Sequence, residues 1–261
     1  MPSLLEQLRQ KRLFRQFLIF FFAVIVFHSV IYYPVYLFLA SDIAWKSSIV
    51  FFLWAEIAEP LSVYLFFWGS FAYVIYAGIR YSVRAAIPYL VVYSIGSVLR
   101  YALQNVCFIL MMGFPSWQRS FSPLEILWNV LLDLLIMGCV YGLLLLHRPR
   151  MESAGKTAFE NCFLIDGFFD LKSMLVRLSL LSAAIPSIAR LVTRAYYDVR
   201  TIVFEGLAPS GAPEIFLMVT YYVTDILTAL LGHLLILTML SSFHISDVRA
   251  QMRFDGEERK G

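Results

Sequence analysis

The chain has 261 residues, of which 60% are hydrophobic and 15% are charged, and its formal net charge is +3. Soluble domains average about 45–50% apolar and about 25% charged residues, so this composition excludes an ordinary soluble domain and indicates an integral membrane protein. The basic residues lie beside apolar segments and form no concentrated basic face, so we expect contact with lipid headgroups and no nucleic-acid partner.

Six apolar segments are long enough, at about 20 residues or more, to cross a bilayer as helices. In chain order they are residues 17–40, 49–76, 87–112, 126–146, 174–193 and 215–241. The second is too long for one simple span, and Pro60 within it predicts a kink or a tilt. We therefore expect an all-α fold: a polytopic transmembrane helical bundle of about six spans, forming a single integral membrane domain over residues 1–261.

Lysine and arginine residues gather on one side of the predicted membrane. Four of them lie between positions 9 and 15, before a first segment of about 24 apolar residues, which is too long for a cleavable signal and is expected to be an anchor. Other basic residues follow the second, fourth and sixth segments. The positive-inside rule then predicts that the N-terminal residues 1–16 and the tail 242–261 are both inside. The membrane we expect is a bacterial-type cytoplasmic (plasma) membrane.

The main cytoplasmic loop is expected at residues 147–172. Phenylalanines alternate there with acidic residues and Asn161, a pattern typical of a short segment lying in the plane of the headgroups. A loop packed against the helix ends fits equally well, and a docking site for a partner subunit is the sharper hypothesis. The loop is too short for a soluble domain, so any ATP-hydrolysing module must belong to another chain.

Two similar six-residue sequences indicate an internal repeat. The sequence Ile-Gly-Ser-Val-Leu-Arg ending at Arg100 parallels Ile-Pro-Ser-Ile-Ala-Arg ending at Arg190. Asp133 and Asp225 follow in the next segments at nearly the same offset. This predicts a parallel two-helix pseudo-repeat about an axis along the membrane normal, with a fainter third copy in the first two spans.

Ionisable side chains inside the apolar segments are the strongest functional signal. A charge at membrane depth costs about 2.5–3.5 kcal/mol on insertion scales, so such residues pair, line a cavity, or do both. Helical spacing of four extends the polar stripes to further side chains on the same faces. The candidate site residues are Glu59, Arg100, Gln104, Asn129, Asp133, Arg190 and Asp225, with His233 as a proton-relay candidate.

Three interpretations of these residues stay open. In a dry lattice, Arg100 pairs with Asp133 and Arg190 with Asp225, which fixes helix packing. In a water-accessible pocket facing the outer side, the arginines bind an anion, because a guanidinium contacts carboxylate or phosphate bidentately. In a proton pathway, the acids and His233 titrate in relay.

The favoured function is a transporter of a small, anionic solute, or the membrane-embedded substrate-binding subunit of a larger transporter. A non-transporting scaffold or assembly subunit is the first alternative, and an intramembrane enzyme acting on lipid or prenyl substrates is the second. No catalytic set is apparent. The three cysteines have no metal-ligand spacing, so we expect no metal and no cofactor.

Overall fold

The structure is a computed structural model, and it describes residues 4–41, 49–50, 54, 59–120, 123–161, 173–204 and 212–258. Over these ranges the chain is almost entirely helical and contains no strand. The elements in chain order are α1 (Leu4–Val26), η1 (Phe27–Tyr32), α2 (Tyr33–Ser41), α5 (Glu59–Tyr64), η3 (Leu65–Gly69), α6 (Ser70–Arg80), η4 (Val83–Ala86), α7 (Ile87–Met112), α8 (Phe114–Ser120), α9 (Pro123–Asn161), α10 (Met174–Val199), η6 (Arg200–Phe204) and α11 (Ala212–Glu258).

Six helical stretches in the described ranges are long and apolar enough to cross a membrane, which confirms the all-helical membrane class. They are Gln7–Ser41, Ser62–Arg80, Val83–Met112, Ile126–Arg148, Met174–Tyr196 and Tyr222–Arg249. The second begins later than the predicted segment 49–76, much of whose first part lies outside the described residues.

Two helices continue beyond the predicted spans. The predicted loop 147–172 begins as helix, because α9 continues to Asn161, and residues 162–172 lie outside the described part. The tail predicted from residue 242 is likewise helical, since α11 continues to Glu258. Polar side chains that leave the bilayer are compatible with a continuing helix, so the end of an apolar run does not mark the end of the helix.

The first span is one continuous helix with a widened turn in its middle. The π-helical η1 joins α1 to α2, and Pro34 follows at the second residue of α2. Proline has no backbone N–H and its ring crowds the carbonyl one turn earlier, which accounts for the widened turn before it. This turn carries His28 and Ser29, both buried.

Helix α6 lies at the centre of the bundle. Its span is 83% buried, whereas the other five are 22–44% buried and present apolar side chains to the outside. Its side chains Phe71, Ala72, Val74 and Ile75 are fully buried. Around it, aromatic rings pack in series, with centroids 5.2 Å apart for Phe21–Phe66 and 4.9 Å for Phe66–Tyr93.

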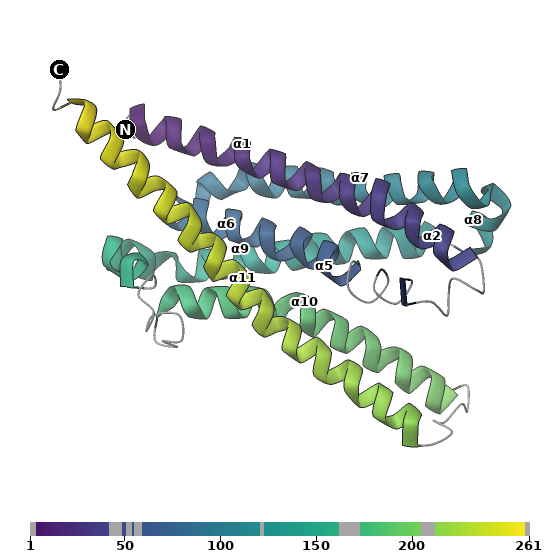
Figure 1. Ribbon diagram of the computed structural model, residues 1–261. Helices are drawn as coiled ribbons and strands as arrows, with labels where there is room; N and C mark the ends of the chain where they lie inside the picture. Colours follow the sequence, from purple (N-terminus) through teal and green to yellow (C-terminus); the bar gives the residue numbers. More distant parts are fainter. Residues whose placement is uncertain are drawn as a thin grey trace.

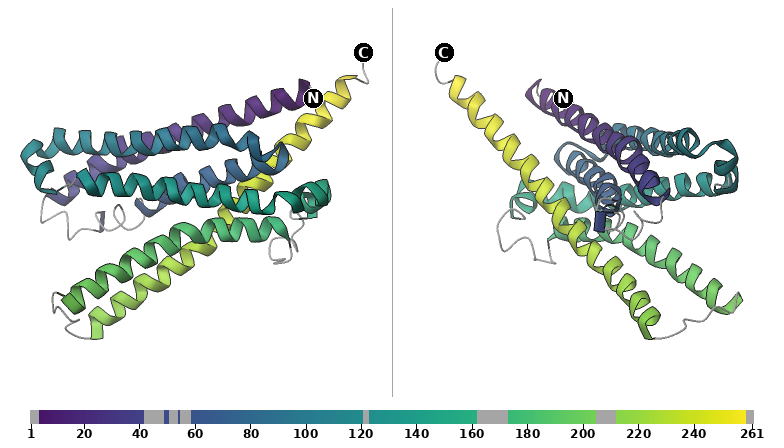
Figure 2. Two further views of the ribbon diagram at one scale, coloured as in Figure 1. Left: turned by 180° about the vertical axis from the view of Figure 1, so that it is seen from behind. Right: turned by 45° about the vertical axis from the view of Figure 1, so that its right-hand side comes forward.

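The bundle has two parts that diverge toward one end (Figure 1). Helix α10 and the first half of α11 form a long hairpin that leans away from α1, α7 and α9, and α11 then crosses back over the bundle. The same divergence is visible from both directions in Figure 2. The two chain termini lie at the other end of the molecule, near each other.

Candidate functional site

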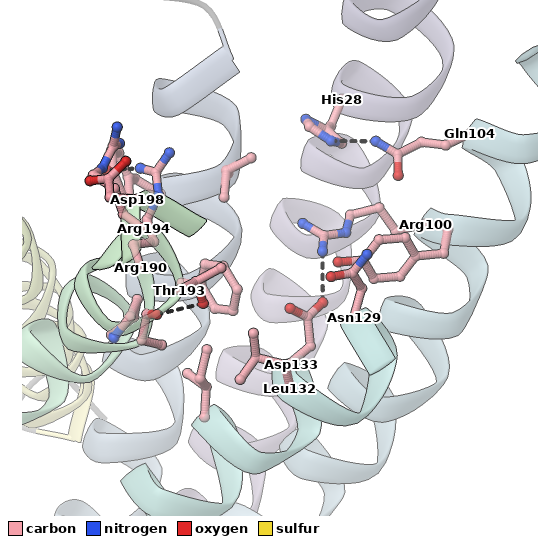
Figure 3. A pocket seen from close by; sticks show the side chains of 17 residues that line it. His28, Arg100, Gln104, Asn129, Leu132, Asp133, Arg190, Thr193, Arg194 and Asp198 are labelled. Carbon is pink, nitrogen blue, oxygen red and sulfur yellow. Dashed lines mark hydrogen bonds and ion pairs between the residues drawn. The ribbon is translucent and has the colours of Figure 1, made fainter. Parts of the chain in front are cut away.

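A cavity of about 660 Å³ lies between α10 and the rest of the bundle (Figure 3). Its walls come from η1, α5, η3, α7 and α9 on one side and from α10 on the other. The lining residues are His28, Val63, Tyr64, Phe67, Arg100, Tyr101, Gln104, Asn129, Leu132, Asp133, Ile136, Pro186, Ala189, Arg190, Thr193, Arg194 and Asp198. The cavity therefore combines apolar and aromatic surface with charged groups from both walls.

The first wall contains a buried ion pair between α7 and α9. An Nη of Arg100 donates to Oδ2 of Asp133 at 2.6 Å, and both side chains are about 95% buried. The hydroxyl of Ser97, one turn earlier on α7, donates to the same oxygen at 2.7 Å. This is the Arg100–Asp133 pair expected from the sequence, with a serine that fixes the carboxylate in place.

Aromatic rings hold the Arg100 guanidinium on two sides. Its central carbon lies 4.4 Å from the ring centroid of Phe66 and 4.6 Å from that of Tyr101, within the range of cation–π attraction. Its Nε is buried and has no hydrogen-bond acceptor among the described residues. The guanidinium is thus held between two rings and its carboxylate partner.

His28 links three helices next to this pair. Its Nδ1 lies 2.7 Å from the Ser62 hydroxyl oxygen, and its Nε2 lies 2.7 Å from the Gln104 side-chain nitrogen. A Gln104 amide that donates to Nε2 requires the proton on Nδ1, which then donates to Ser62. A neutral histidine satisfies both contacts, and it fixes Gln104 at the cavity wall (Figure 3).

The second wall differs from the sequence-based expectation. Asp225 on α11 pairs with Nε of Arg194 at 3.0 Å, so the predicted Arg190–Asp225 pair is wrong. Arg190 instead donates to the Tyr64 hydroxyl and lies with its central carbon 5.3 Å from the Tyr64 ring centroid. Residues four apart share a helix face, so Arg190 and Arg194 compete for the same acid, and the axial position of α10 relative to α11, which separates them by about one turn of 5.4 Å, decides between them.

Arg190, Arg194 and Asp198 form a stripe along α10. They are spaced four residues apart, and Figure 3 shows them on the wall that faces the Arg100–Asp133 pair. The hydroxyl of Tyr222 on α11 donates to Asp198 at 2.6 Å, which ties the hairpin together beyond the Arg194–Asp225 pair. The stripe therefore presents charge to the cavity and anchors α10 to α11 at the same time.

The structure brings most predicted site residues together. Arg100, Gln104, Asn129, Asp133 and Arg190 all line the cavity. Asp225 does not line it and contacts it through Arg194. Glu59 begins α5, but its side chain lies outside the described part of the structure.

His233 lies elsewhere in the bundle, and it is not among the lining residues of the cavity. It is buried between α10 and α11, where its Nδ1 lies 2.8 Å from the Ser179 hydroxyl oxygen. The proton-relay hypothesis would thus need steps between His233 and the cavity that the described contacts do not provide.

Several lining residues were not among the predicted site residues. Arg194 lies on the polar stripe that the spacing of four predicts from Arg190, Asp198 continues that spacing by one step, and His28 was visible as a histidine within a span. Tyr64 and Tyr101 carry no such signal, because tyrosines are common in this chain and their role depends on how the helices rotate.

Within the described ranges, no group of three or more His, Cys, Asp or Glu side chains is arranged to hold a metal ion. A scan against protein-family models gave no match, and comparisons with curated proteins and with solved structures gave none either. The argument for a function therefore depends on the geometry of the cavity.

Proposed function

We propose that this protein is a transporter of a small anionic solute, or the membrane-embedded substrate-binding subunit of one. The observation that carries the proposal is a partly open cavity with arginine side chains on both walls: Arg100 on α7, and Arg190 and Arg194 on α10. Its volume of about 660 Å³ lies within the range of small-molecule sites. The solute would bind between the two diverging parts of the bundle.

The charge distribution supports an anion. Arg100 and Arg194 each have an aspartate partner, whereas Arg190 is exposed and contacts Tyr64 rather than a carboxylate among the described residues. A guanidinium on such a wall suits a carboxylate or phosphate group, which it contacts through two parallel hydrogen bonds. Arg100 places a second guanidinium in the opposite wall of the cavity.

The apolar part of the lining supports a solute that is more than a bare inorganic ion. Phe67, Leu132 and Ile136 line the cavity beside the charged groups. A small organic acid would place its carboxylate on the arginines and its carbon skeleton on these side chains. Binding sites of this kind are mostly apolar, with a few polar groups that orient the ligand.

The proposal includes an orientation. Both termini would lie in the cytoplasm of a bacterial-type cell, as the distribution of lysine and arginine predicts. The cavity would then face the outer half of the membrane, because it lies toward the end of the bundle opposite the termini. A partner subunit that supplies energy would dock on the cytoplasmic side, at residues 147–172.

A degenerate repeat would account for the two walls. In each of the hairpins α7–α9 and α10–α11, an arginine on the first helix pairs with an aspartate on the second: Arg100 with Asp133, and Arg194 with Asp225. We propose that these are two copies of one unit, shifted by one helical turn at the arginine.

The competing function is a non-transporting scaffold. It is favoured by the same two ion pairs, because intramembrane polar contacts orient helices without any solute. The two functions differ in whether water reaches the cavity.

Labelling of an introduced cysteine distinguishes them. Asn129→Cys would be made in a chain whose native cysteines are replaced by serine, and Leu135→Cys on the same helix is the matched control. Asn129 lines the cavity, whereas Leu135 is 63% exposed on the apolar outside. A transporter predicts reaction of Asn129→Cys with a membrane-impermeant thiol reagent added outside, and none of Leu135→Cys. An unreactive Asn129→Cys would favour the scaffold.

A further inference from the structure

A second cavity, of about 500 Å³, lies at the other end of α6. It is formed by the turn between α6 and η4 and by the α9 residue that ends the fourth span. Its lining consists of Gly78, Ile79, Tyr81, Ser82, Val83, Arg84 and Arg148. Two arginines from different helices therefore meet at this cavity, and none of its described lining residues is acidic.

The turn that carries Arg84 is held by its own hydrogen bonds. The backbone N–H groups of Tyr81 and Ser82 both donate to the carbonyl of Ala77, at 3.1 and 3.3 Å. The Ser82 side chain accepts from the N–H of Ala85 at 3.1 Å, which starts η4. Since the Ser82 hydroxyl acts as an acceptor in this contact, its own proton is available to a ligand.

The position of the cavity relative to the spans indicates its surroundings. The second span ends at Arg80, the third begins at Val83 and the fourth ends at Arg148. These three boundaries meet at the cavity, which places it at the depth where lipid headgroups lie once the six stretches cross a bilayer. It is the same end of the bundle as the termini.

Exposed apolar side chains lie close in sequence to both cavity arginines, on the membrane side of the span boundaries. Ile87 at the start of α7 and Leu145 and Leu146 near the end of the fourth span are 45%, 46% and 76% exposed. Acyl chains can lie on such a surface while a headgroup occupies the polar cavity. A soluble phosphate compound would make no use of it.

We propose that this cavity binds the phosphate of an anionic phospholipid headgroup. Arg84 and Arg148 contact the phosphate oxygens, since guanidinium groups bind phosphate through charge-assisted, bidentate hydrogen bonds. The Ser82 hydroxyl donates a further hydrogen bond. This site is independent of the solute cavity and does not rest on the transport function.

Native mass spectrometry of the full chain in mild detergent tests the proposal. The probes are phosphatidylglycerol, phosphatidylcholine and inorganic phosphate, added separately and in competition. The test variant is Arg84→Gln/Arg148→Gln. The control is Arg12→Gln/Arg15→Gln, which removes two exposed arginines from the same predicted face, outside the cavity.

The wild-type chain is expected to retain phosphatidylglycerol about tenfold more strongly than phosphatidylcholine. The test variant is expected to lose about tenfold in affinity, and the control to stay within about twofold. Arg84→Lys/Arg148→Lys, which keeps the charge, should retain most of the binding. Arg84→Gln alone changes an exposed side chain, so it keeps the test available if the double variant does not fold.

Three results would overturn the proposal. The first is an equal loss in the test and control variants, which would mean that general surface charge attracts the lipid. The second is equal retention of the two lipids. The third is binding of inorganic phosphate that displaces the lipid completely, which would assign the cavity to a soluble phosphate compound.

Discussion

Arg194, and not Arg190, forms the ion pair with Asp225, with Nε and Oδ2 3.0 Å apart. This one-turn difference separates two tasks along α10. Arg194 binds α10 to α11, and Arg190 reaches the opposite wall of the cavity, where it contacts Tyr64. If acids on α11 paired with both Arg190 and Arg194, the α10 wall of the cavity would present no arginine to a solute.

Arg190→Ala is therefore expected to impair solute binding with little effect on stability. Its side chain is exposed and donates only to Tyr64 among the described residues, so its loss should change the free energy of unfolding by less than about 1 kcal/mol. Affinity should fall by at least about tenfold, because a charge-assisted contact is removed. A thermal-shift screen of purified protein with acetate, succinate and inorganic phosphate measures both quantities.

The control for this screen is Arg177→Ala, an exposed arginine on the same helix that does not line the cavity. It should leave the response to an active anion unchanged. If an anion stabilised Arg190→Ala as much as the wild-type chain, Arg190 would have no part in the site.

Asp133→Asn is expected to be strongly destabilising. It leaves the Arg100 guanidinium charged and buried without its carboxylate, and removing one partner of a buried pair costs about 3–5 kcal/mol. The double variant Arg100→Leu/Asp133→Leu replaces both charges by apolar groups and should recover most of this loss. Thermal unfolding of the three chains in detergent gives the comparison.

The same double variant separates binding from packing. If Arg100 contacts the solute, the double variant folds but no longer responds to the anion. A double variant that is as unstable as Asp133→Asn would contradict the explanation by an unpaired charge. One that binds the anion normally would remove Arg100 from the site.

Features that depend on segment length or on the cost of a lone charge could be predicted from the sequence, whereas those that depend on how the helices pack could not. The helical spans could be predicted, because the length of an apolar run decides whether it can cross a bilayer. The Arg100–Asp133 pair could also be predicted, since each charge is costly alone and each hairpin offers few partners. The choice between Arg190 and Arg194 could not, because both lie on one face of α10 and the choice depends on how far α10 is displaced along its axis relative to α11.

The role of His28 could not be predicted from the sequence either. Its partners, Ser62 and Gln104, are 34 and 76 residues away in the chain, on two other helices. Nothing local distinguishes a histidine that fixes a cavity wall from one that fills a core. The full length of α9 and α11 could not be predicted for a simpler reason: both continue as helices after their apolar runs end.

Asp225→Asn should cost less stability than Asp133→Asn, although both aspartates are buried. The Arg194 side chain is 30% exposed, so water can solvate its guanidinium once the carboxylate is gone. We expect a loss of about 1.5–3 kcal/mol, the value of a hydrogen bond to a charged group rather than of a buried ion pair. Thermal unfolding of both variants under one set of conditions tests the order, and a larger loss for Asp225→Asn would contradict it.

Gly96→Ala tests the contact between α7 and α1, which sets the wall of the cavity that carries Arg100. A Cβ at Gly96 would overlap the Phe21 ring and lie 2.9 Å from Cδ1 of Ile25, and both of these side chains are buried. Overpacking of this kind costs about 1–3 kcal/mol. Gly138→Ala is the matched control, because a Cβ there meets no atom within 4 Å and α9 gains a better helix former.

The expected result is a lower melting temperature for Gly96→Ala and an equal or higher one for Gly138→Ala. Because Arg100 lies one turn beyond Gly96 on α7, the shift of α7 should also weaken anion binding, even though Gly96 does not line the cavity. A Gly96→Ala chain with unchanged melting temperature would show that α1 and α7 are not packed as closely as described. A destabilised chain with unchanged anion affinity would show that the position of α7 does not control the site.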